Sequence, residues 1–443
     1  MAPKKKGKRK RNKLGLFIGT LCAVLACGTV ILVLLGAQIG NLGENLESKV
    51  EEWVEQLSST KENGKKNTEE TASKRWEQLE FSSKNDEGEE RAESPSAETS
   101  RYGDILSNPE RMKEEHIYIR DAVTSDEITL LFAGDILFDD GYSPMARLRA
   151  RNMGIAGVMS QDLLQLMQNA DVFMLNNEFP YSDRGSPLEG KQFTFRANPQ
   201  NADLLTDMGV DVVSLANNHA FDYGQDALLD TFAALQRLHI PYVGAGQDIE
   251  EASDAVFFVV NDYKIGILSA TQIERLDNPD TKGATENTPG VFRCWNIDAL
   301  LQKITQVRQQ CDYLVVYIHW GTENSTEIDW AQEKQAAQIA RAGVDLIVGD
   351  HPHCLQKMAV IDGVPVIYSL GNFWFNSKDL DTGLLQVTIS MNGEHAPQVR
   401  FIPARQQGCE TFLATGSEKE RILNEMRELS AGVTLNEDGI LIQ

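Results

Sequence analysis

The sequence is poor in cysteine, in histidine and, beyond its first residues, in positive charge. It has six cysteines and seven histidines among 443 residues, and no close-spaced cysteine pair marks a disulfide-rich scaffold or a zinc knuckle. Eight of the 42 basic residues lie in residues 1–13, which leaves 34 bases against 65 acids and a net charge of −31 for the rest. Because nucleic acid is bound through basic surface, we expect no nucleic-acid partner for the main body.

The sequence also lacks a second long apolar run, which excludes a multi-span membrane protein. The run at residues 14–39 is uncharged over 26 residues and is long enough to cross roughly 30 Å of hydrocarbon as a helix. The basic residues 1–13 before it predict a cytoplasmic N-terminus and an extracellular C-terminal part. A cleaved signal peptide, or a lipoprotein site at Cys27, is the alternative, but the run is long and stays apolar after Cys27. We therefore expect an uncleaved, single-pass anchor in the cell membrane.

Residues 40–120 predict an acidic, low-complexity stalk. Positions 41–100 hold 16 acids and eight bases with few large apolar groups, so they bury too little surface to offset chain entropy, which predicts disorder. From residue 121 to 443, apolar strands alternate with helical periods, which is typical of an α/β domain. Strands are expected at 128–133, 172–175, 212–215, 264–269, 313–318, 346–348 and 366–368, and helices at 199–208, 225–238, 298–309 and 329–342.

Polar side chains follow five of these strands at the point where each strand ends. They are Asp135, the run Asn176-Asn177-Glu178, the run Asn217-Asn218-His219, His319, and the run Asp350-His351-Pro352-His353. Any one of them alone is better explained as a turn or a satisfied polar group. However, four of the seven histidines fall at these strand ends, and functional groups of α/β sheets gather past the carboxyl ends of strands. The repetition therefore predicts one shared site.

Carboxylate, amide and imidazole donors together form a shell that suits manganese, iron or zinc. One or two divalent ions are expected; two ions about 3.5–4 Å apart can activate a bridging water and stabilise both oxygens of a phosphoryl transfer. A histidine beside a ligand can then protonate the leaving oxygen.

The motifs resemble the bacterial capsule-synthesis CapA family, which is associated with poly-γ-glutamate capsules. They are LLFAGD at 130–135, NNE at 176–178, SLANNHAFDYG at 214–224, YIHWGTE at 317–323, GDHPH at 349–353 and YSLGNF at 368–373. That family is similar in fold to the calcineurin-like metallophosphoesterases, which implies a four-layer αββα sandwich. The resemblance implies six metal ligands and a proton donor, His219; the ligands are Asp135, Glu178, Asn218, His319, His351 and His353.

The sequence departs from the metallophosphoesterase pattern at one predicted ligand. Leu137 stands where a histidine usually follows the first aspartate by two residues, so the first metal site lacks one expected donor. Two further carboxylates have alternative interpretations. Asp350 either orients a neighbouring imidazole or caps a turn, and Asp222 either holds the His219 ring in its useful tautomer or caps the helix before Gln225.

Two residues are candidates for contacts with substrate. Arg196 has a planar fork that suits a phosphate or a carboxylate, although a surface ion pair is an equally good interpretation. Asn372 lies in a run, 369–373, that lacks the pattern of a nucleophile turn and is expected to line the pocket.

Three functions are compatible with these residues. The first is a membrane-anchored extracellular factor of capsule or poly-γ-glutamate synthesis with a metallophosphoesterase-like metal site. The second is a metal-dependent hydrolase of a phosphoester or amide in cell-envelope material, and the third is a polymer-binding scaffold without catalysis. The expected partners are a capsule or envelope polymer, other membrane proteins of capsule synthesis, and the membrane itself through residues 14–39.

Overall fold

A computed structural model describes residues 100–273 and 281–442. The predicted basic tail, the membrane span at 14–39 and the stalk up to residue 99 lie outside the described residues. In the part that is described, no helix is both long and apolar enough to cross a membrane.

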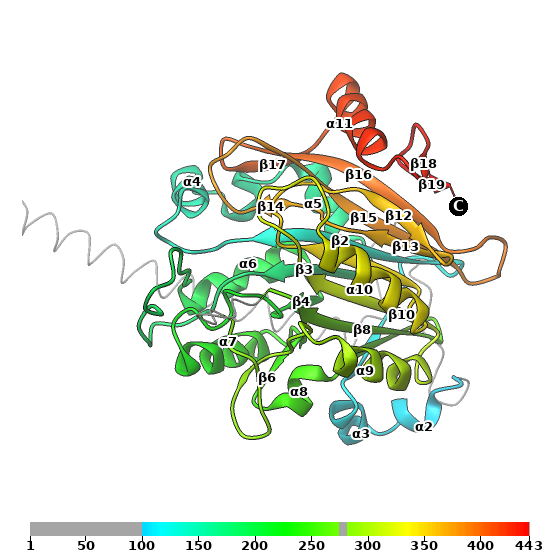
Figure 1. The fold of residues 1–443 in the computed structure, drawn as a ribbon, viewed down its shortest axis with the longest axis horizontal. Helices are drawn as coiled ribbons and strands as arrows, with labels where there is room; N and C mark the ends of the chain where they lie inside the picture. The colour runs from blue at the N-terminus through cyan, green and yellow to red at the C-terminus, as the bar shows by residue number, and fades with distance from the viewer. Residues whose placement is uncertain (1–99, 274–280, 443) are drawn as a thin grey trace, which may run out of the picture. The chain divides into compact units, whose positions relative to one another are not determined.

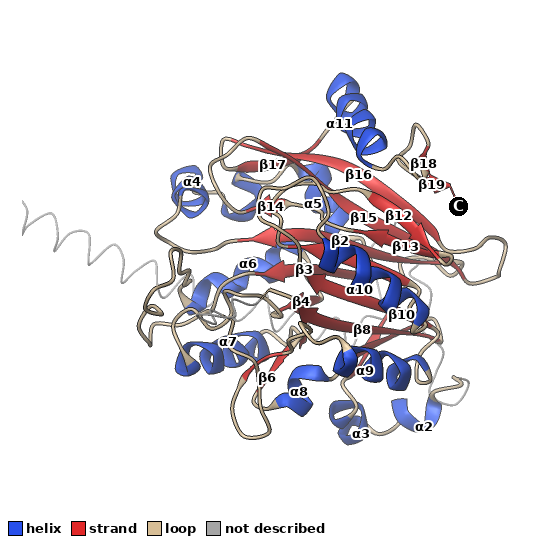
Figure 2. Ribbon diagram, viewed as in Figure 1, coloured by secondary structure: helices blue, strands red, loops and turns tan. Residues whose placement is uncertain are grey.

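Two mixed sheets form the centre of the described fold (Figures 1 and 2). The seven-stranded sheet has the order β1 (Ile117–Arg120), β7 (Val256–Val260), β8 (Tyr263–Thr271), β10 (Tyr313–His319), β11 (Leu346–Asp350), β13 (Val364–Ile367) and β12 (Met358–Ile361). The eight-stranded sheet has the order β17 (Glu410–Leu413), β16 (Gln398–Gln407), β15 (Leu380–Ser390), β2 (Glu127–Ile136), β3 (Val172–Asn177), β4 (Val212–Ser214) and β5 (Tyr242–Val243), and β14 (Asn372–Trp374) pairs with β2. Small ladders join β6 (Ala245–Gly246) to β9 (Gly290–Val291) and β18 (Thr434–Leu435) to β19 (Leu441–Ile442).

Helices cover the outer faces of both sheets, as expected for an αββα arrangement. The outer face of the eight-stranded sheet packs against α5 (Gln161–Gln168), α6 (Asp203–Met208) and α7 (Gln225–Arg237). The outer face of the seven-stranded sheet packs against α9 (Asp298–Arg308) and α10 (Trp330–Arg341). The remaining helical segments are α2 (Gly103–Leu106), α3 (Pro109–Glu114), α4 (Ser143–Arg151), α8 (Ile249–Ser253), α11 (Gly416–Leu429), η1 (Gly154–Gly157) and η2 (Pro199–Ala202).

Alternating side chains explain why each central strand contributes to two cores. In β2, Leu130 and Phe132 face the core between the sheets, whereas Leu131 and Ala133 face the helices outside. This is the period of two that a strand imposes on its side chains. Because both faces are covered, these strands read as continuous apolar runs, which is why they could be predicted from the sequence.

All seven expected strands are present, and so are the helices expected at 225–238, 298–309 and 329–342. The helix expected at 199–208 is instead the 3₁₀ segment η2 followed by the short helix α6. The helix expected at 329–342 begins at its N-cap Asp329, which forms a capping box with Gln332. The domain also reaches further toward the N-terminus than residue 121. β1, inside the range expected for the stalk, pairs in parallel with β7, and its Ile117 is 4% exposed. The last residues of the expected stalk are therefore an edge strand of the sheet.

Gly134 lies within β2, directly ahead of Asp135, at the point where this strand packs closely against Leu370 and Gly371. A Cβ atom at Gly134 would lie 1.9 Å from the carbonyl oxygen of Gly371, and the Asp135 amide donates to that same oxygen. We expect Gly134→Ala to lower the free energy of unfolding by about 1–3 kcal/mol, since the backbone must move to accommodate the methyl group. Gly432→Ala is the matched control, because nothing lies within 4 Å of a Cβ at Gly432. Urea unfolding of both variants tests this; equal midpoints would contradict it.

Candidate metal centre

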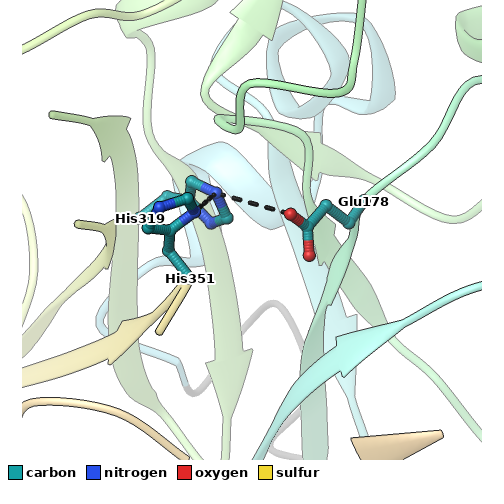
Figure 3. Close-up of side chains that lie close together, drawn as sticks. All are labelled: Glu178, His319 and His351. Carbon is teal, nitrogen blue, oxygen red and sulfur yellow. Dashed lines mark hydrogen bonds and ion pairs between the residues drawn. The ribbon is translucent and has the colours of Figure 1, made fainter. Parts of the chain in front are cut away.

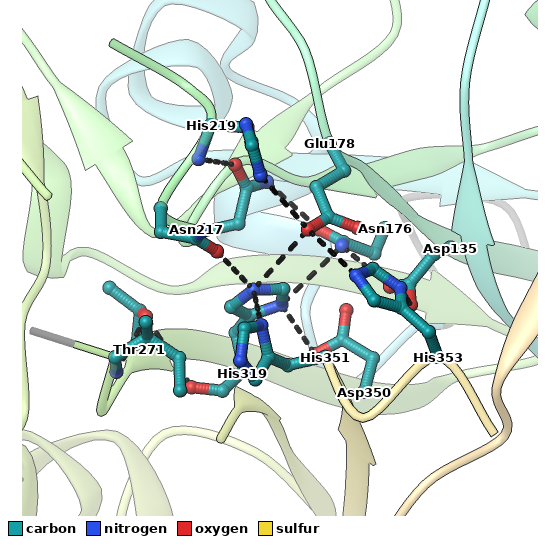
Figure 4. A network of polar contacts seen from close by, with 12 residues as sticks. Asp135, Asn176, Glu178, Asn217, His219, Thr271, His319, Asp350, His351 and His353 are labelled. Atoms are coloured by element: carbon teal, nitrogen blue, oxygen red, sulfur yellow. Dashed lines mark hydrogen bonds and ion pairs between the residues drawn. The ribbon is translucent and has the colours of Figure 1, made fainter. Parts of the chain in front are cut away.

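The polar residues predicted from the strand ends lie together between the carboxyl ends of the two sheets (Figure 4). Parallel strands β2, β3 and β4 of one sheet and β10 and β11 of the other end at this point. Asp135 is the second-last residue of β2, Glu178 follows β3, and His319 ends β10. Asn218, His351 and His353 join them from the loops after β4 and β11. The structure thus brings all six predicted ligands into one buried cluster.

Glu178 lies at the centre of this cluster. Its Oε1 is 3.7 Å from His319 Nε2 and 4.0 Å from the Nε2 atoms of both His219 and His353. The residue is 0% exposed, yet neither carboxylate oxygen has a hydrogen-bond partner. A buried polar group normally has one, since leaving it unpaired costs about 1–3 kcal/mol or more. A buried carboxylate with one oxygen facing imidazole nitrogens and neither oxygen hydrogen-bonded is an arrangement that a cation would complete (Figure 3).

His319 connects the two sheets within the cluster. Its Nδ1 lies 3.0 Å from Asp350 Oδ1, and its Nε2 lies 2.8 Å from Asn218 Oδ1 and 2.9 Å from His351 Nδ1. A hydrogen bond from one imidazole nitrogen fixes the tautomer and aims the lone pair of the other. Asp350 therefore contacts His319 in the manner of the orienting carboxylate.

Asp135 and His353 form the other side of the cluster. His353 Nδ1 lies 3.0 Å from Asp135 Oδ2, and Asn176 donates to Asp135 Oδ1 at 2.9 Å. His351 and His353 adopt positive φ values, 93° and 58°, a conformation that costs a non-glycine residue free energy. The ligand loop after β11 is thus held in a strained shape that turns both imidazoles toward the carboxylates.

Burial and mutual repulsion shift the ionisation of this cluster. Burial, with the negative charges of Asp135 and Asp350, raises the pKa of Glu178 well above its usual value. Burial lowers the pKa of His319 to about 3 and also holds that of His351 well below its usual value. A neutral imidazole keeps a free lone pair, which is the form that can bind a metal ion. His353 differs, because its contact with Asp135 raises its pKa despite burial. The three close carboxylates repel one another, and a bound cation would relieve this repulsion.

Three overlapping donor sets among the described residues satisfy the spacing of a metal site. Glu178, His319 and His351 offer ligand atoms within 4.8 Å of one another, and so do Asp135, Glu178 and His353. Glu178 is common to both sets, and Asn218 adds an amide oxygen beside His319. A third set, Asp135, His319 and Asp350, shares members with these two. The residues present therefore fit one or two divalent ions, and Glu178 could contribute a donor to either.

His219 lies at the rim of the cluster with a carboxylate behind it. Its Nδ1 is 2.6 Å from Asp222 Oδ2, while Nε2 points to Glu178 at 4.0 Å. The N-cap of α7 is Gly224, without a side-chain cap, so the helix-cap alternative for Asp222 is not what the structure shows. Burial lowers the pKa of His219 despite the neighbouring carboxylate.

Comparison with known proteins assigns the family. The model of the family described as bacterial capsule synthesis protein PGA_cap matches residues 129–377, more than half of the chain. The chain belongs to this family. It is 27% identical over 325 residues to the PGA biosynthesis protein CapA of Bacillus subtilis, covering 72% of this chain and 82% of that protein. It is 29% identical over 273 residues to the capsule biosynthesis protein CapA of Bacillus anthracis, covering 59% and 64%.

Among solved structures, a 5′-nucleotidase from Candida albicans is similar with a TM-score of 0.36 and 9% identity. The match covers 64% of this chain and 53% of that one. The family membership rests on the sequence match, and the site on the chain's own residues.

Leu137, the departure from the expected ligand pattern, packs away from the cluster. It is 0% exposed and belongs to the apolar core beneath the helices of the eight-stranded sheet. Leu137 therefore offers no donor to the set around Asp135 in this PGA_cap domain, which consists of Asp135, Glu178 and His353.

The two predicted substrate contacts lie at different places in the PGA_cap domain. Asn372 is inside the cluster: its Oδ1 is 2.9 Å from His353 Nδ1, and its Nδ2 is buried without a partner. Arg196 instead lays its guanidinium 4.3 Å from the centre of the Tyr223 ring and donates to the Arg184 carbonyl. None of the described contacts of Arg196 reaches a predicted ligand.

Two residues that contact His219 or its partner Asp222 were not predicted from the sequence. The Phe195 ring lies 4.3 Å from the His219 ring, and Lys191 forms a buried ion pair with Asp222. Both come from the long loop between β3 and η2. A lone aromatic residue in a loop, or a single lysine 31 positions from its partner, carries no signal in one sequence.

Proposed function

We propose that this PGA_cap protein is a membrane-anchored, extracellular factor of poly-γ-glutamate capsule synthesis that works as a metal-dependent hydrolase. Its site is proposed to be of the calcineurin-like metallophosphoesterase type, acting on a phosphoester or an amide of the cell envelope. The observation that carries the proposal is the buried Glu178 carboxylate, whose two oxygens lack partners and which is common to two donor sets.

In this proposal Glu178, Asn218, His319 and His351 would hold one ion, and Asp135, Glu178 and His353 would hold a second. A bound divalent metal supplies Lewis acidity toward the substrate and lowers the pKa of water. Asp350 keeps the His319 ring in place through its Nδ1. His219, with Nε2 toward Glu178 and Nδ1 on Asp222, gives a proton to the departing oxygen or nitrogen.

Elemental analysis and an activity screen test this function together. The chain, purified without chelator, is expected to carry near-stoichiometric manganese, iron or zinc and to cleave a generic phosphodiester. Chelation should abolish cleavage, and adding the metal back should restore it. A metal-free protein that gains no thermal stability from manganese or zinc would contradict the metal site. A loaded protein without activity would favour the scaffold, which keeps the pocket for polymer binding.

The membrane part of the proposal rests on the sequence of residues 1–39. Protease added to intact cells is expected to remove the region after Gly40 and to leave the basic tail protected, because the positive residues favour the cytoplasm. A soluble form that starts near residues 37–41 would show signal cleavage instead.

The proposed partners follow from the relatives. The CapA proteins of B. subtilis and B. anthracis are named for PGA and capsule biosynthesis, so the polymer and other membrane proteins of its synthesis are the proposed partners of this chain. The net charge after residue 13 is negative, which opposes electrostatic capture of a polyanion over the whole surface. Contact with such a polymer is therefore proposed for the metal site.

A further inference from the structure

Lys191 is a buried cation beside the metal cluster. Its side chain is 6% exposed and that of its partner Asp222 is 0% exposed. The ammonium donates to Asp222 Oδ1 at 2.5 Å and also to the main-chain carbonyl oxygen of Asn218. Surface ion pairs contribute little to stability, but the pair of Lys191 with Asp222 is buried. Through its two contacts Lys191 touches the carboxylate partner of His219 and the backbone of Asn218, a proposed metal ligand.

The loop that carries Lys191 donates several hydrogen bonds to Asp222. The Phe195 amide donates to Asp222 Oδ2 at 2.7 Å, and the Leu188 amide donates to the Asp222 carbonyl at 2.9 Å. Oδ2 is also the atom that lies 2.6 Å from His219 Nδ1. Each carboxylate oxygen of Asp222 is thereby held by a donor from the same loop, and the His219 ring is the remaining partner.

We propose that Lys191 is a positioning residue for the reaction: it fixes the Asp222 carboxylate so that His219 keeps Nδ1 toward Asp222 and Nε2 toward the metal cluster. The Phe195 ring, 4.3 Å from the imidazole, limits the remaining rotation of His219. The second contact of Lys191, to the Asn218 carbonyl, ties the proton donor and a metal ligand to one cation. This inference rests on the proposed function in so far as His219 acts as the general acid.

A change of leaving group separates this role from a purely structural one. Protonation by His219 matters for an alkyl phosphodiester but not for a 4-nitrophenyl ester, whose leaving group departs as a stable anion. In the full chain, Lys191→Met is expected to lower kcat on the alkyl ester on the order of 10- to 100-fold, part of the usual general-acid contribution. KM, metal content and the rate on the 4-nitrophenyl ester should change less than about threefold.

Double substitution tests whether Lys191 acts through Asp222. Residues that work as a unit show strongly non-additive effects, so Lys191→Met combined with Asp222→Asn should be no slower than Asp222→Asn alone. Lys303→Met is the matched control, because it removes another lysine–aspartate ion pair, to Asp254 at 2.8 Å, outside the cluster. Equal losses on both esters, additive losses, or no loss at all would each overturn the proposal.

If the protein hydrolyses none of these esters, the proposed function is contradicted but the positioning role of Lys191 is not. A spectroscopic measurement then tests that role separately. The Nδ1 proton between His219 and Asp222 should give a downfield proton resonance that disappears in His219→Ala. Lys191→Met should shift or abolish it, and Lys303→Met should not. An unchanged resonance in Lys191→Met overturns the positioning role. Lys191→Gln, which can still donate to the Asn218 carbonyl, serves in the same experiments if Lys191→Met does not fold.

Discussion

Glu178→Gln is expected to abolish metal binding while leaving the metal-free protein at least as stable as the unaltered chain. The carboxylate is common to two donor sets, so its loss removes a donor from each. At the same time the change removes a buried acid whose oxygens have no partners and whose pKa is raised by burial and by Asp135. A residue kept for packing alone would show the opposite result, because its alteration would lower the stability.

Urea unfolding with and without manganese measures both effects. A ligand at 100 times its Kd stabilises a protein by about 2.7 kcal/mol, and this gain should be absent in Glu178→Gln. Glu323→Gln is the control: Glu323 is exposed and its charge reaches Glu178, but it belongs to none of the donor sets found among the described residues. Retained metal in Glu178→Gln, or a metal-free form of that variant that is clearly destabilised, would count against Glu178 as a donor shared by the two sets.

His219→Ala is expected to reduce hydrolysis by about 10²- to 10⁴-fold without loss of metal or of folding. His219 directly follows the proposed ligand Asn218, but its own Nε2 is 4.0 Å from Glu178, and it belongs to none of the donor sets in the described part of the chain. Asp135→Ala and His351→Ala should lower the metal content as well as the rate. The measurements are phosphodiesterase rate, metal content, and polymer formation in cells.

His395→Ala is the matched control for His219→Ala, since His395 is exposed and pairs with Glu127 outside the cluster. Full activity in His219→Ala together with inactive ligand variants would make the metal structural. If all of these variants behave like the unaltered protein, the pocket is a relic and the protein acts through its surface.

The gathering of these polar residues at one edge of the sheets could be predicted because each of the five polar segments follows an apolar strand. The choice of six residues within these segments as metal ligands came from the family resemblance. Asp135 and His319 lie in the last two positions of strands that are buried on both faces. Parallel strands bring their carboxyl ends to one edge of the sheet. A local pattern in the sequence was therefore enough to bring together residues more than 180 positions apart.

The surroundings of His219 could not be predicted in the same way. Lys191 and Phe195 belong to an irregular loop, and their contacts with Asp222 depend on how that loop returns over the sheet. The strands β15 and β16 were also missed, because polar residues such as Gln386 and Thr388 interrupt the apolar ones. Their pairing partners, β2 among them, are set by tertiary contacts.

The proposed ligands come from two separate sheets: Asp135, Glu178 and Asn218 from one, and His319, His351 and His353 from the other. An ion held by both groups of residues would link the two sheets directly. This link would add to the apolar core that packs between the sheets. Opening of the sandwich would then require metal release, so amide exchange near the ends of β3 and β10 should slow together when metal is added. Cells short of the metal would, on this proposal, degrade the protein faster, because the open form is the one that proteases cleave.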